Sequence, residues 1–335
     1  MYGHQLLRVL AVVLVFGFGA AWMLGLSGAV APVLLDLDAG AGTEAEPRAA
    51  DETGSPDEGE DGEEGEDAGA GYPGERQIEA LAQAYPERIG ETELRDGQWA
   101  ARIDDTWYYY AEGRMLPREL VNRYDEFTPL RLRPYETGPA ELREVDDELA
   151  ERLRRRDRER AEDPPTRHNG FLDALYQVSS AREAEQRMVR ISFLGLSTRV
   201  HPKIVEPLER VEAEIRDLAQ HDAEVRAFVE SLRTASGFFW REIAGTASRS
   251  YHSYGIAIDL IPHSYEGRYG YWRWAKDAGI EEWWALPFDR RWEVPQPVVD
   301  AFEAEEFIWG GKWLSFDPIH FEYRPERFIL GGYRD

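Results

Sequence analysis

Two histidines and two aspartates stand at spacings that could build a metal site near the carboxyl-terminal end of the chain. His252 and Asp259 share one short segment, and Asp317 and His320 share another segment further along. Side chains of a strand alternate between its faces, so a strand after Gly255 turns its isoleucines to one face and Asp259 to the other, toward a cleft. Gly255 permits a turn that swings His252 back toward Asp259. The sequence therefore predicts that imidazole and carboxylate groups converge.

Two imidazoles and one carboxylate are the ligands of many catalytic zinc sites, because three protein ligands leave a fourth position open for water. Bound zinc lowers the pKa of that water, and a free carboxylate nearby can accept its proton. Asp317 has the right position in the sequence for this second role. The spacing alone also fits a structural hydrogen bond between a histidine and an aspartate, which is the commoner arrangement of such a pair.

Both segments together resemble the signature of the zinc D-alanyl-D-alanine carboxypeptidase family. The resemblance implies the α+β fold that this family shares with lysostaphin and the hedgehog signalling domain. It implies His252, Asp259 and His320 as Zn²⁺ ligands, the general base at Asp317, and peptidoglycan stem peptides as the substrate. The positions that carry it are Ser250, His252, Gly255, Ala257, Asp259, Asp317, His320, Phe321 and Glu322.

The resemblance covers about residues 200 to 326 and includes Arg241, where the family often has an arginine near the substrate carbonyl or carboxylate. It implies a D-Ala-D-Ala carboxypeptidase. An endopeptidase of the L-Ala-D-Glu type is an alternative, because the two activities differ in whether a free carboxylate must be held. A catalytically silent wall-binding module on the same fold is a second alternative. A tethered structural or partner-binding protein, in which residues 76–165 matter most, is a third.

Three other histidines and one glutamate lie near these segments in the sequence. His263 is a rival ligand, because it follows Asp259 closely in the sequence. His201 and His221 are expected on the surface or on a helix face. Glu322 lies two residues after His320, on the same strand face, and can orient its imidazole by a hydrogen bond.

Most of the eleven tryptophans lie between Trp240 and Trp313, in the interval that holds the candidate ligands. Aromatic walls exclude water and offer flat surfaces to sugars and peptides. Most of these side chains should be core, as large aromatic residues usually are. Trp309 and Trp313 are the first candidates for substrate contact, because they flank two glycines near His320.

Residues 1–35 predict a transmembrane signal anchor or a signal peptide. Residues 9–31 carry no charge and are long enough as a helix to cross a hydrocarbon core of about 30 Å. Arg8 precedes them and acidic residues follow, so the positive-inside rule places the rest of the chain outside the cytoplasm, at the periplasmic face of the inner membrane. Cleavage after the small residues 29–31 would release a secreted protein. The chain has no cysteine, which excludes disulfides and thiolate ligands.

Residues 36–75 predict a disordered acidic linker. They contain many acidic residues but one basic residue, Arg48, and few apolar side chains that a core could bury. Much of the net charge of −25 therefore belongs to a self-repelling tether. Nucleic acid is an unsuitable partner, because the chain has no basic stripe that could displace counterions from phosphates.

Residues 76–165 predict an N-terminal ordered region that ends at Pro164 and Pro165, and residues 166–335 predict the zinc peptidase domain. Apolar spacing indicates helices and strands in both regions, and helices followed by an antiparallel sheet favour an α+β domain with its site in an open cleft. The predicted helices are 77–85, 141–162, 171–187 and 206–232, and the predicted strands are 98–103, 106–111, 189–194 and the one after Gly255.

Overall fold

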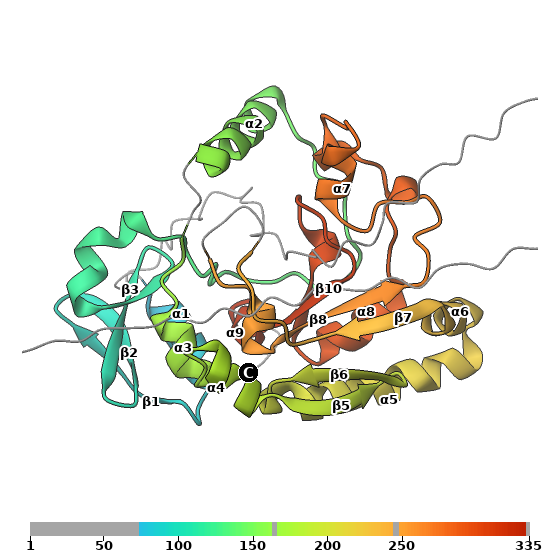
Figure 1. Ribbon diagram of the computed structural model, residues 1–335. Coiled ribbons are helices and arrows are strands. Elements are labelled where there is room, and N and C mark those ends of the chain that lie inside the picture. The colour runs from blue at the N-terminus through green and yellow to red at the C-terminus, as the bar shows by residue number, and fades with distance from the viewer. Residues whose placement is uncertain (1–73, 163–165, 244–247, 333–335) are drawn as a thin grey trace, which may run out of the picture. The chain divides into compact units, whose positions relative to one another are not determined.

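The computed structural model describes residues 74–162, 166–243 and 248–332, and its elements are labelled in Figure 1. Segment 9–31 and nearly all of segment 36–75 lie outside the described residues, so the predicted anchor and linker remain predictions. Within the described ranges, none of the helices combines the length and the apolar character that crossing a bilayer requires. Helices and antiparallel sheets make up the described elements, which confirms the predicted α+β class.

A helix and a four-stranded antiparallel meander form the first part of the described chain. The strands pair in chain order, and residues with positive φ at Asp96, Gly97, Glu112 and Gly113 close two of the turns. Such turns match the twist of paired strands. The two strands predicted here are confirmed with their bounds, and the predicted helix is confirmed. The elements are α1 (Glu75–Ala84), β1 (Ile89–Arg95), β2 (Gln98–Ile103), β3 (Thr106–Ala111), β4 (Arg114–Pro117) and the 3₁₀ segment η1 (Arg118–Glu126).

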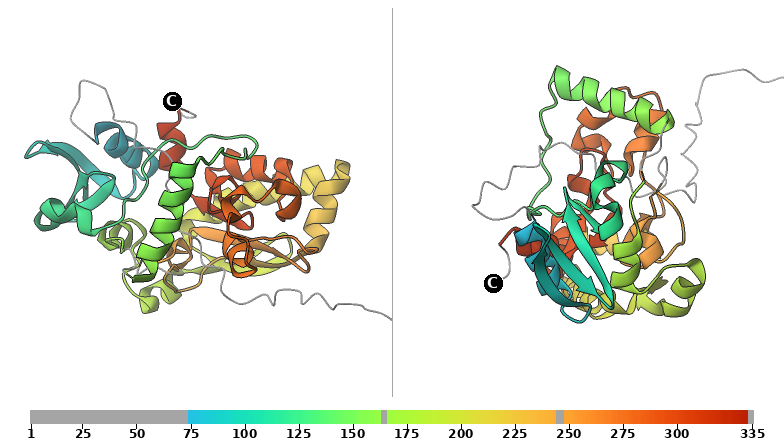
Figure 2. Two further views of the ribbon diagram at one scale, coloured as in Figure 1. Left: turned by 90° about the horizontal axis from the view of Figure 1, so that it is seen from above. Right: turned by 90° about the vertical axis from the view of Figure 1, so that its left-hand side faces the viewer.

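The first helix packs against the last one, α9 (Pro325–Leu330), so the two ends of the described chain meet. Figure 2 shows α1 and α9 side by side when the molecule is viewed from above. Ile78 and Leu81 of α1 and Leu330 of α9 are buried in one apolar cluster. Tyr85, directly after α1, is also buried there. The N-terminal meander is thereby joined to the segment that follows the candidate ligand His320.

A second antiparallel sheet carries the candidate ligands. Its strand order is β7-β8-β10-β9, and its register sets His320 opposite Asp259. α5 and α8 pack on each other, and Phe302 of α8 stacks on Phe321 of β10 with 3.9 Å between ring centroids. The elements are α5 (Val205–His221), α6 (Ala223–Ser231), β7 (Leu232–Ser236), β8 (Ala257–Pro262), α8 (Gln296–Ala304), β9 (Phe307–Trp309) and β10 (His320–Tyr323).

Two predicted helices are each broken into two. Asp222 interrupts the predicted helix 206–232, because its side chain accepts hydrogen bonds from the backbone N–H groups of Glu224 and Val225 and starts a new helix. Gln177 interrupts the predicted helix 171–187 with a left-handed conformation at φ 54°, and Ser180 caps the next helix. A separate hairpin follows. The elements are α3 (Gly170–Tyr176), α4 (Ala181–Arg187), β5 (Val189–Phe193) and β6 (Leu196–Val200).

A second apolar cluster lies around α7 (Trp272–Asp277) and α2 (Asp147–Glu162), which are neighbours in Figures 1 and 2. Leu153 of α2 is buried there with Trp272 and Trp283, and Phe316 belongs to the same cluster. The backbone N–H of Trp272 donates to Phe316 O at 3.0 Å. The segment with Trp272, Trp274, Trp283 and Trp284, here called the tryptophan-rich loop, is therefore held at the residue directly before Asp317.

Candidate metal centre

Side chains from a 3₁₀ turn and two strands converge at the centre of the second sheet. His252 lies in the turn η3 (Tyr251–Tyr254), Asp259 in β8 and His320 in β10. His252 Nε2 lies 3.2 Å from Asp259 Oδ1 and 3.2 Å from His320 Nδ1, and the remaining side of the triangle, His320 Nδ1 to Asp259 Oδ1, measures 2.7 Å. These three side chains form a group that could hold a metal ion. The structure thus brings together the three predicted ligands.

The turn that delivers His252 forms as the sequence predicts. Ser250 caps η3 by accepting a hydrogen bond from the backbone N–H of His252. Gly255 ends the turn at φ 66°, and its N–H donates to His252 O at 3.0 Å. A side chain at Gly255 would be strained by this φ, and its Cβ would come within 2.7 Å of the backbone nitrogen of His201. Glycine is therefore required where the chain reverses into β8.

Hydrogen bonds on the far side of each ring fix which imidazole nitrogen faces the centre. His252 Nδ1 lies 2.6 Å from Gly237 O, and His320 Nε2 lies 3.0 Å from Glu322 Oε1. A carbonyl and a carboxylate can only accept, so both of these nitrogens carry hydrogen and the opposite nitrogens present lone pairs. Oriented imidazoles of this kind are typical of metal ligands. The contact at His320 Nε2 confirms the hydrogen bond predicted between Glu322 and the His320 imidazole.

The size of the triangle fits a small tetrahedral cation. Ligand atoms about 2.0 to 2.1 Å from a tetrahedral zinc ion are about 3.3 to 3.4 Å apart. Two sides of the triangle are 3.2 Å and the third is 2.7 Å, so a modest expansion of one side reaches that spacing. Two lone pairs and a carboxylate oxygen facing one another also require a proton or a cation between them. The donor set therefore fits Zn²⁺.

Electrostatics at the centre favour positive charge. Burial raises the pKa of the Asp259 carboxyl, but His252 and His320 outweigh burial and hold that pKa well below its ordinary value. Burial lowers the pKa of His320, but hydrogen bonds with Asp259 and Glu322 outweigh burial and raise that pKa to about 10. In the metal-free protein a proton on His320 therefore supplies the positive charge that a cation would bring.

We expect the metal-free protein to lose stability as pH rises. The pKa of an imidazole in an unfolded chain is about 6.5, whereas that of His320 in the fold is about 10. The folded state binds this proton more tightly, so its stabilising effect is complete below about pH 6.5 and is lost as pH rises through about 10. Thermal unfolding of chelator-treated protein across this interval should show a falling Tm. Saturating Zn²⁺ should remove the trend, and an unchanged Tm without metal would contradict the expectation.

Asp317 lies beside the three converging side chains. Its carbonyl accepts the backbone N–H of His320 at 3.1 Å, and its own N–H donates to Gly310 O at 2.9 Å. The carboxyl group is buried, and within the described residues its Oδ1 has no hydrogen-bond partner. Burial raises its pKa well above the ordinary value, and the Asp259 and Glu322 charges act in the same direction, against His320 and Arg241. The Asp317 carboxyl is therefore a buried group beside the converging ligands, with one oxygen that the described residues leave without a hydrogen bond.

Arg241 supplies positive charge close to Asp317. Its backbone N–H donates to Ser253 Oγ at 2.9 Å, and Ser253 Oγ donates back to Arg241 O at 2.8 Å, so this residue is tied to the turn that carries His252. The side chain is partly buried, and none of the described residues makes a hydrogen bond or ion pair with its guanidinium. The Arg241 charge opposes the rise in pKa at both Asp317 and Tyr271.

Two tyrosines near Asp317 were missed in the sequence. Tyr271 is buried, and its hydroxyl has no hydrogen-bond partner in the described part of the chain. Burial raises the pKa of Tyr271, and Asp317 adds to the rise. Burial, Asp317 and Asp259 likewise raise the pKa of Tyr265. In sequence these tyrosines look like the other aromatic residues of the tryptophan-rich loop, so no signal separated them.

Three expectations about nearby residues are wrong. Asp259 was expected to face a cleft, but it is buried with 1 % of its surface exposed, because the chain covers both faces of β8. His201 was expected on the surface or on a helix face, but it is buried and only precedes a 3₁₀ segment: its Nε2 lies 3.0 Å from Tyr176 O, and burial lowers its pKa to about 4. Trp309 was a first candidate for substrate contact, but it is a core residue whose indole N–H donates to Pro318 O at 2.7 Å.

The remaining candidates are two histidines, His263 and His221, and one tryptophan, Trp313. His263, the rival ligand, is exposed and lies outside the converging group, and His221 is exposed as expected. Trp313 is largely buried, with its ring centroid 5.5 Å from that of His320. Trp313 therefore forms apolar surroundings for one candidate ligand.

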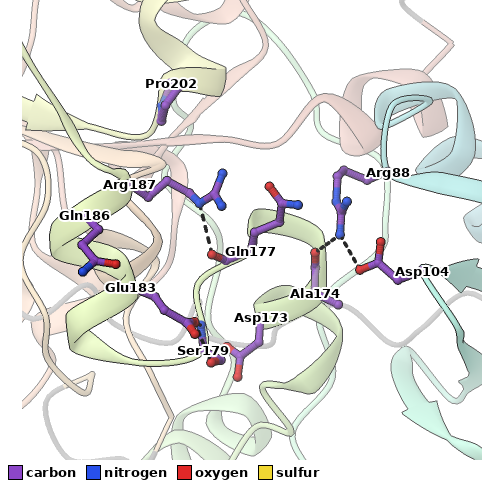
Figure 3. Close-up of a pocket in the computed structure, with 10 residues that line it drawn as sticks. All are labelled: Arg88, Asp104, Asp173, Ala174, Gln177, Ser179, Glu183, Gln186, Arg187 and Pro202. Atoms are coloured by element: carbon purple, nitrogen blue, oxygen red, sulfur yellow. Dashed lines mark hydrogen bonds and ion pairs between the residues drawn. The ribbon is translucent and has the colours of Figure 1, made fainter.

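A polar pocket of about 690 Å³ lies elsewhere, between the meander and α3 and α4. Figure 3 shows Arg88 bound to Asp104 and to Ala174 O, and Arg187 bound to Gln177 O. None of the converging metal-site residues lines this pocket. Both arginines of the pocket are thus already engaged. Arg88 joins the meander to α3, and Arg187 joins α4 to the loop that precedes it.

Comparison with known families gives two matches along the chain. Residues 244–323 match the family model described as D-alanyl-D-alanine carboxypeptidase, which confirms the resemblance drawn from the sequence. Residues 77–131 match the model of a domain of unknown function. No solved structure was found to match the chain. The first match contains His252, Asp259, Asp317 and His320. The second match ends in the segment without helix or strand that leads from η1 to α2.

Proposed function

We propose that this chain, whose residues 244–323 belong to the D-alanyl-D-alanine carboxypeptidase family, hydrolyses peptidoglycan stem peptides with Zn²⁺ held by His252, Asp259 and His320. The family match supports a peptidase that acts on peptidoglycan. One observation carries the metal assignment: two imidazole lone pairs and a carboxylate oxygen meet within 3.2 Å of one another. Ligands of this type and number are those of catalytic zinc sites.

The residues around the metal would divide the chemistry among them. Zn²⁺ bound there would polarise the scissile carbonyl and activate water. Asp317 Oδ1, which has no partner among the described residues, accepts a proton from the attacking water and passes it to the leaving amine nitrogen. Arg241 binds the developing oxyanion or the terminal carboxylate of the substrate. The Tyr271 hydroxyl is also buried and close enough to Asp317 for that carboxyl to raise its pKa, and it would donate to the substrate oxygen that Arg241 binds.

A carboxypeptidase is the preferred activity, because Arg241 offers a guanidinium that the described residues leave free for a carboxylate. An endopeptidase of the L-Ala-D-Glu type would use the same guanidinium on the oxyanion instead. Digestion of purified muropeptides, read by mass, separates the alternatives. Loss of one alanine supports the carboxypeptidase, an internal cut supports the endopeptidase, and binding without any cleavage supports a silent wall-binding module.

Substitution of Arg241 should distinguish the two roles of its charge. If it holds a terminal carboxylate, Arg241→Ala should raise KM for stem peptides with a free carboxyl terminus by about 10 to 100-fold, the loss expected when a charged hydrogen bond of about 1.5 to 3 kcal/mol is removed. Peptides with an amidated terminus should already bind weakly to the natural protein, and the substitution should change them little. An equal loss of kcat on both substrates would assign Arg241 to the oxyanion.

A substrate of this kind also requires that the peptidase lies outside the cytoplasm, which is part of the same proposal. Peptidoglycan lies outside the cytoplasmic membrane, and the uncharged segment 9–31 with Arg8 before it would anchor the chain with its carboxyl-terminal part on that side. Membrane fractionation of the full chain, with protease accessibility of residues after 75, tests the anchor and its orientation. A shortened mature protein in the soluble fraction would indicate cleavage.

A further inference from the structure

A buried chain of polar side chains leads from the candidate ligand His320 to the N-terminal region. His320 Nε2 donates to Glu322 Oε1 at 3.0 Å, and Glu322 Oε2 lies 3.6 Å from Arg324 Nη1. Arg324 Nε donates to Glu326 Oε1 at 2.6 Å, and Glu326 Oε2 accepts from the Tyr85 hydroxyl at 3.0 Å. We call Glu322, Arg324, Glu326 and Tyr85 the buried polar chain. None of its four members has more than 5 % of its surface exposed.

Arg324 is the branching point of the buried polar chain. Its Nη2 donates to Leu130 O at 2.8 Å, and its Nη1 donates to the Tyr251 hydroxyl at 3.1 Å. Tyr251 precedes the ligand His252, whereas Leu130 and Tyr85 both lie in the 77–131 domain of unknown function. Arg324 and Glu326 are therefore held from that domain at two points, at an end of α1 and in the segment after η1.

A divalent ion would balance the charges along this path. The metal triad and the buried polar chain contain three carboxylates, those of Asp259, Glu322 and Glu326, and one guanidinium, that of Arg324. Two further positive charges are needed to neutralise the set, which is the charge of Zn²⁺. Buried carboxylates are tolerated only when they are paired and hydrogen-bonded, and removal of one partner leaves the remaining charge uncompensated. A change at Glu326 is thus expected to reach the metal.

We infer that the 77–131 domain is an outer support of the metal centre, with Tyr85 as a positioning residue for the ligand His320. The Tyr85 hydroxyl fixes Glu326, and Glu326 and Leu130 O fix the Arg324 guanidinium. The Arg324 charge then lies 3.6 Å from the carboxylate that orients His320 and attracts it as an ion pair, not through a hydrogen bond. This inference rests on the metal site of the proposed function, but not on hydrolysis. It gives the meander a role in the peptidase that neither family match assigns.

A purely mechanical role of Tyr85 is the alternative explanation. The hydroxyl also contacts the Tyr176 hydroxyl at 2.9 Å, so its loss would weaken packing of α1 on α3 in any case. Tyr108 provides a matched control, since its hydroxyl donates to Gly170 O at 3.0 Å and joins the same domain to α3 through a bond that involves no member of the buried polar chain. Loss of either hydroxyl should lower Tm. Only loss of the Tyr85 hydroxyl should change the metal site.

The test uses the full chain with Tyr85→Phe, Tyr108→Phe, Glu326→Gln and the double variant Tyr85→Phe with Glu326→Gln. Zinc affinity is measured by competition with a chelator, and the ligand field by the visible absorption of the Co²⁺-substituted protein. Outer-shell partners of zinc ligands typically contribute 10 to 100-fold in affinity. We expect Glu326→Gln to weaken zinc binding by about tenfold, at the lower end of that range, and Tyr85→Phe by about threefold because it acts one step further away.

The control and the double variant decide the outcome. Tyr108→Phe should keep the natural zinc affinity and Co²⁺ spectrum, and Tyr85→Phe should add little in the Glu326→Gln background, because both act through one path. Equal zinc affinities of Tyr85→Phe and Tyr108→Phe at similar Tm would overturn the inference, even if Glu326→Gln failed to fold. A natural protein that binds zinc but cleaves no muropeptide would refute the proposed function and leave this inference standing.

Discussion

His320→Ala will remove the metal and abolish hydrolysis. The substitution deletes one of three ligands, and it also takes the central hydrogen-bond partner from Asp259 Oδ1 and from Glu322 Oε1. Both carboxylates are at most 2 % exposed, and each loses one buried partner: Asp259 keeps His252, and Glu322 keeps the Arg324 charge. Breaking a buried charged pair in this way costs about 3 to 5 kcal/mol. We therefore expect a lower Tm together with loss of stoichiometric zinc.

Metal analysis and thermal unfolding of His320→Ala separate these two effects. Zinc per chain is measured after gel filtration, and Tm is measured with and without added Zn²⁺. Zinc should raise the Tm of the natural protein, because a ligand that binds only the folded state stabilises it, but should not raise that of the variant. His263→Ala is the matched control, because His263 is exposed and lies outside the converging group. Full zinc content in His320→Ala would refute the ligand assignment.

Local rules account for the parts of the fold that the sequence predicted well. β2 and β3 have their predicted bounds because Asp104 and Asp105 stand between two runs of strand-forming residues. Gly255 likewise marks the turn before β8, since its φ of 66° is strained for any other residue. Wherever one residue type imposes a backbone conformation, the sequence predicts the structure.

Periodicity fails where an apolar stripe continues across a break. Val225 and Phe228 keep the spacing of Leu208 and Ile215, so the predicted helix 206–232 looked continuous, and the cap formed by Asp222 decides otherwise. Burial of His201 was equally hidden, because it depends on Tyr176 O from a different helix. Such outcomes follow from tertiary contacts that spacing along the chain does not encode.

Some residues of the candidate site could likewise be predicted from the sequence, and others could not. His252, Asp259 and His320 could be named because ligand types recur at motif spacing, and Glu322 because strand alternation places it beside His320. The buried polar chain could not be named, since Tyr85 and Glu326 are separated by 241 positions. The sequence motif therefore predicts the metal ligands, whereas the residues that support those ligands become visible only in the three-dimensional structure.

Asp317→Asn should keep the metal and remove the activity. The amide is close to the carboxyl group in shape, and Asp317 Oδ1 has no hydrogen-bond partner among the described residues, so the exchange breaks no side-chain contact at that atom. In the metal-free protein burial raises the pKa of this carboxyl, so the site tolerates a neutral side chain there, whereas a bound cation would favour the ionised form that acts as the base. An amide cannot accept a proton, and general bases typically contribute about 10²- to 10⁴-fold. We expect kcat to fall by that factor with zinc content unchanged.

Asp259→Asn is the matched comparison, because it makes the same chemical change at a carboxylate whose pKa the two histidines hold far below its ordinary value. That carboxylate contributes its negative charge to the converging group, so its neutralisation should release zinc and abolish activity. The two variants are compared by zinc per chain and by muropeptide turnover under the same conditions. Loss of zinc from Asp317→Asn would make Asp317 a ligand instead of a base. Retention of activity in Asp317→Asn would require another proton acceptor. Zinc content and turnover of the two variants together thus distinguish the role of Asp259 from that of Asp317.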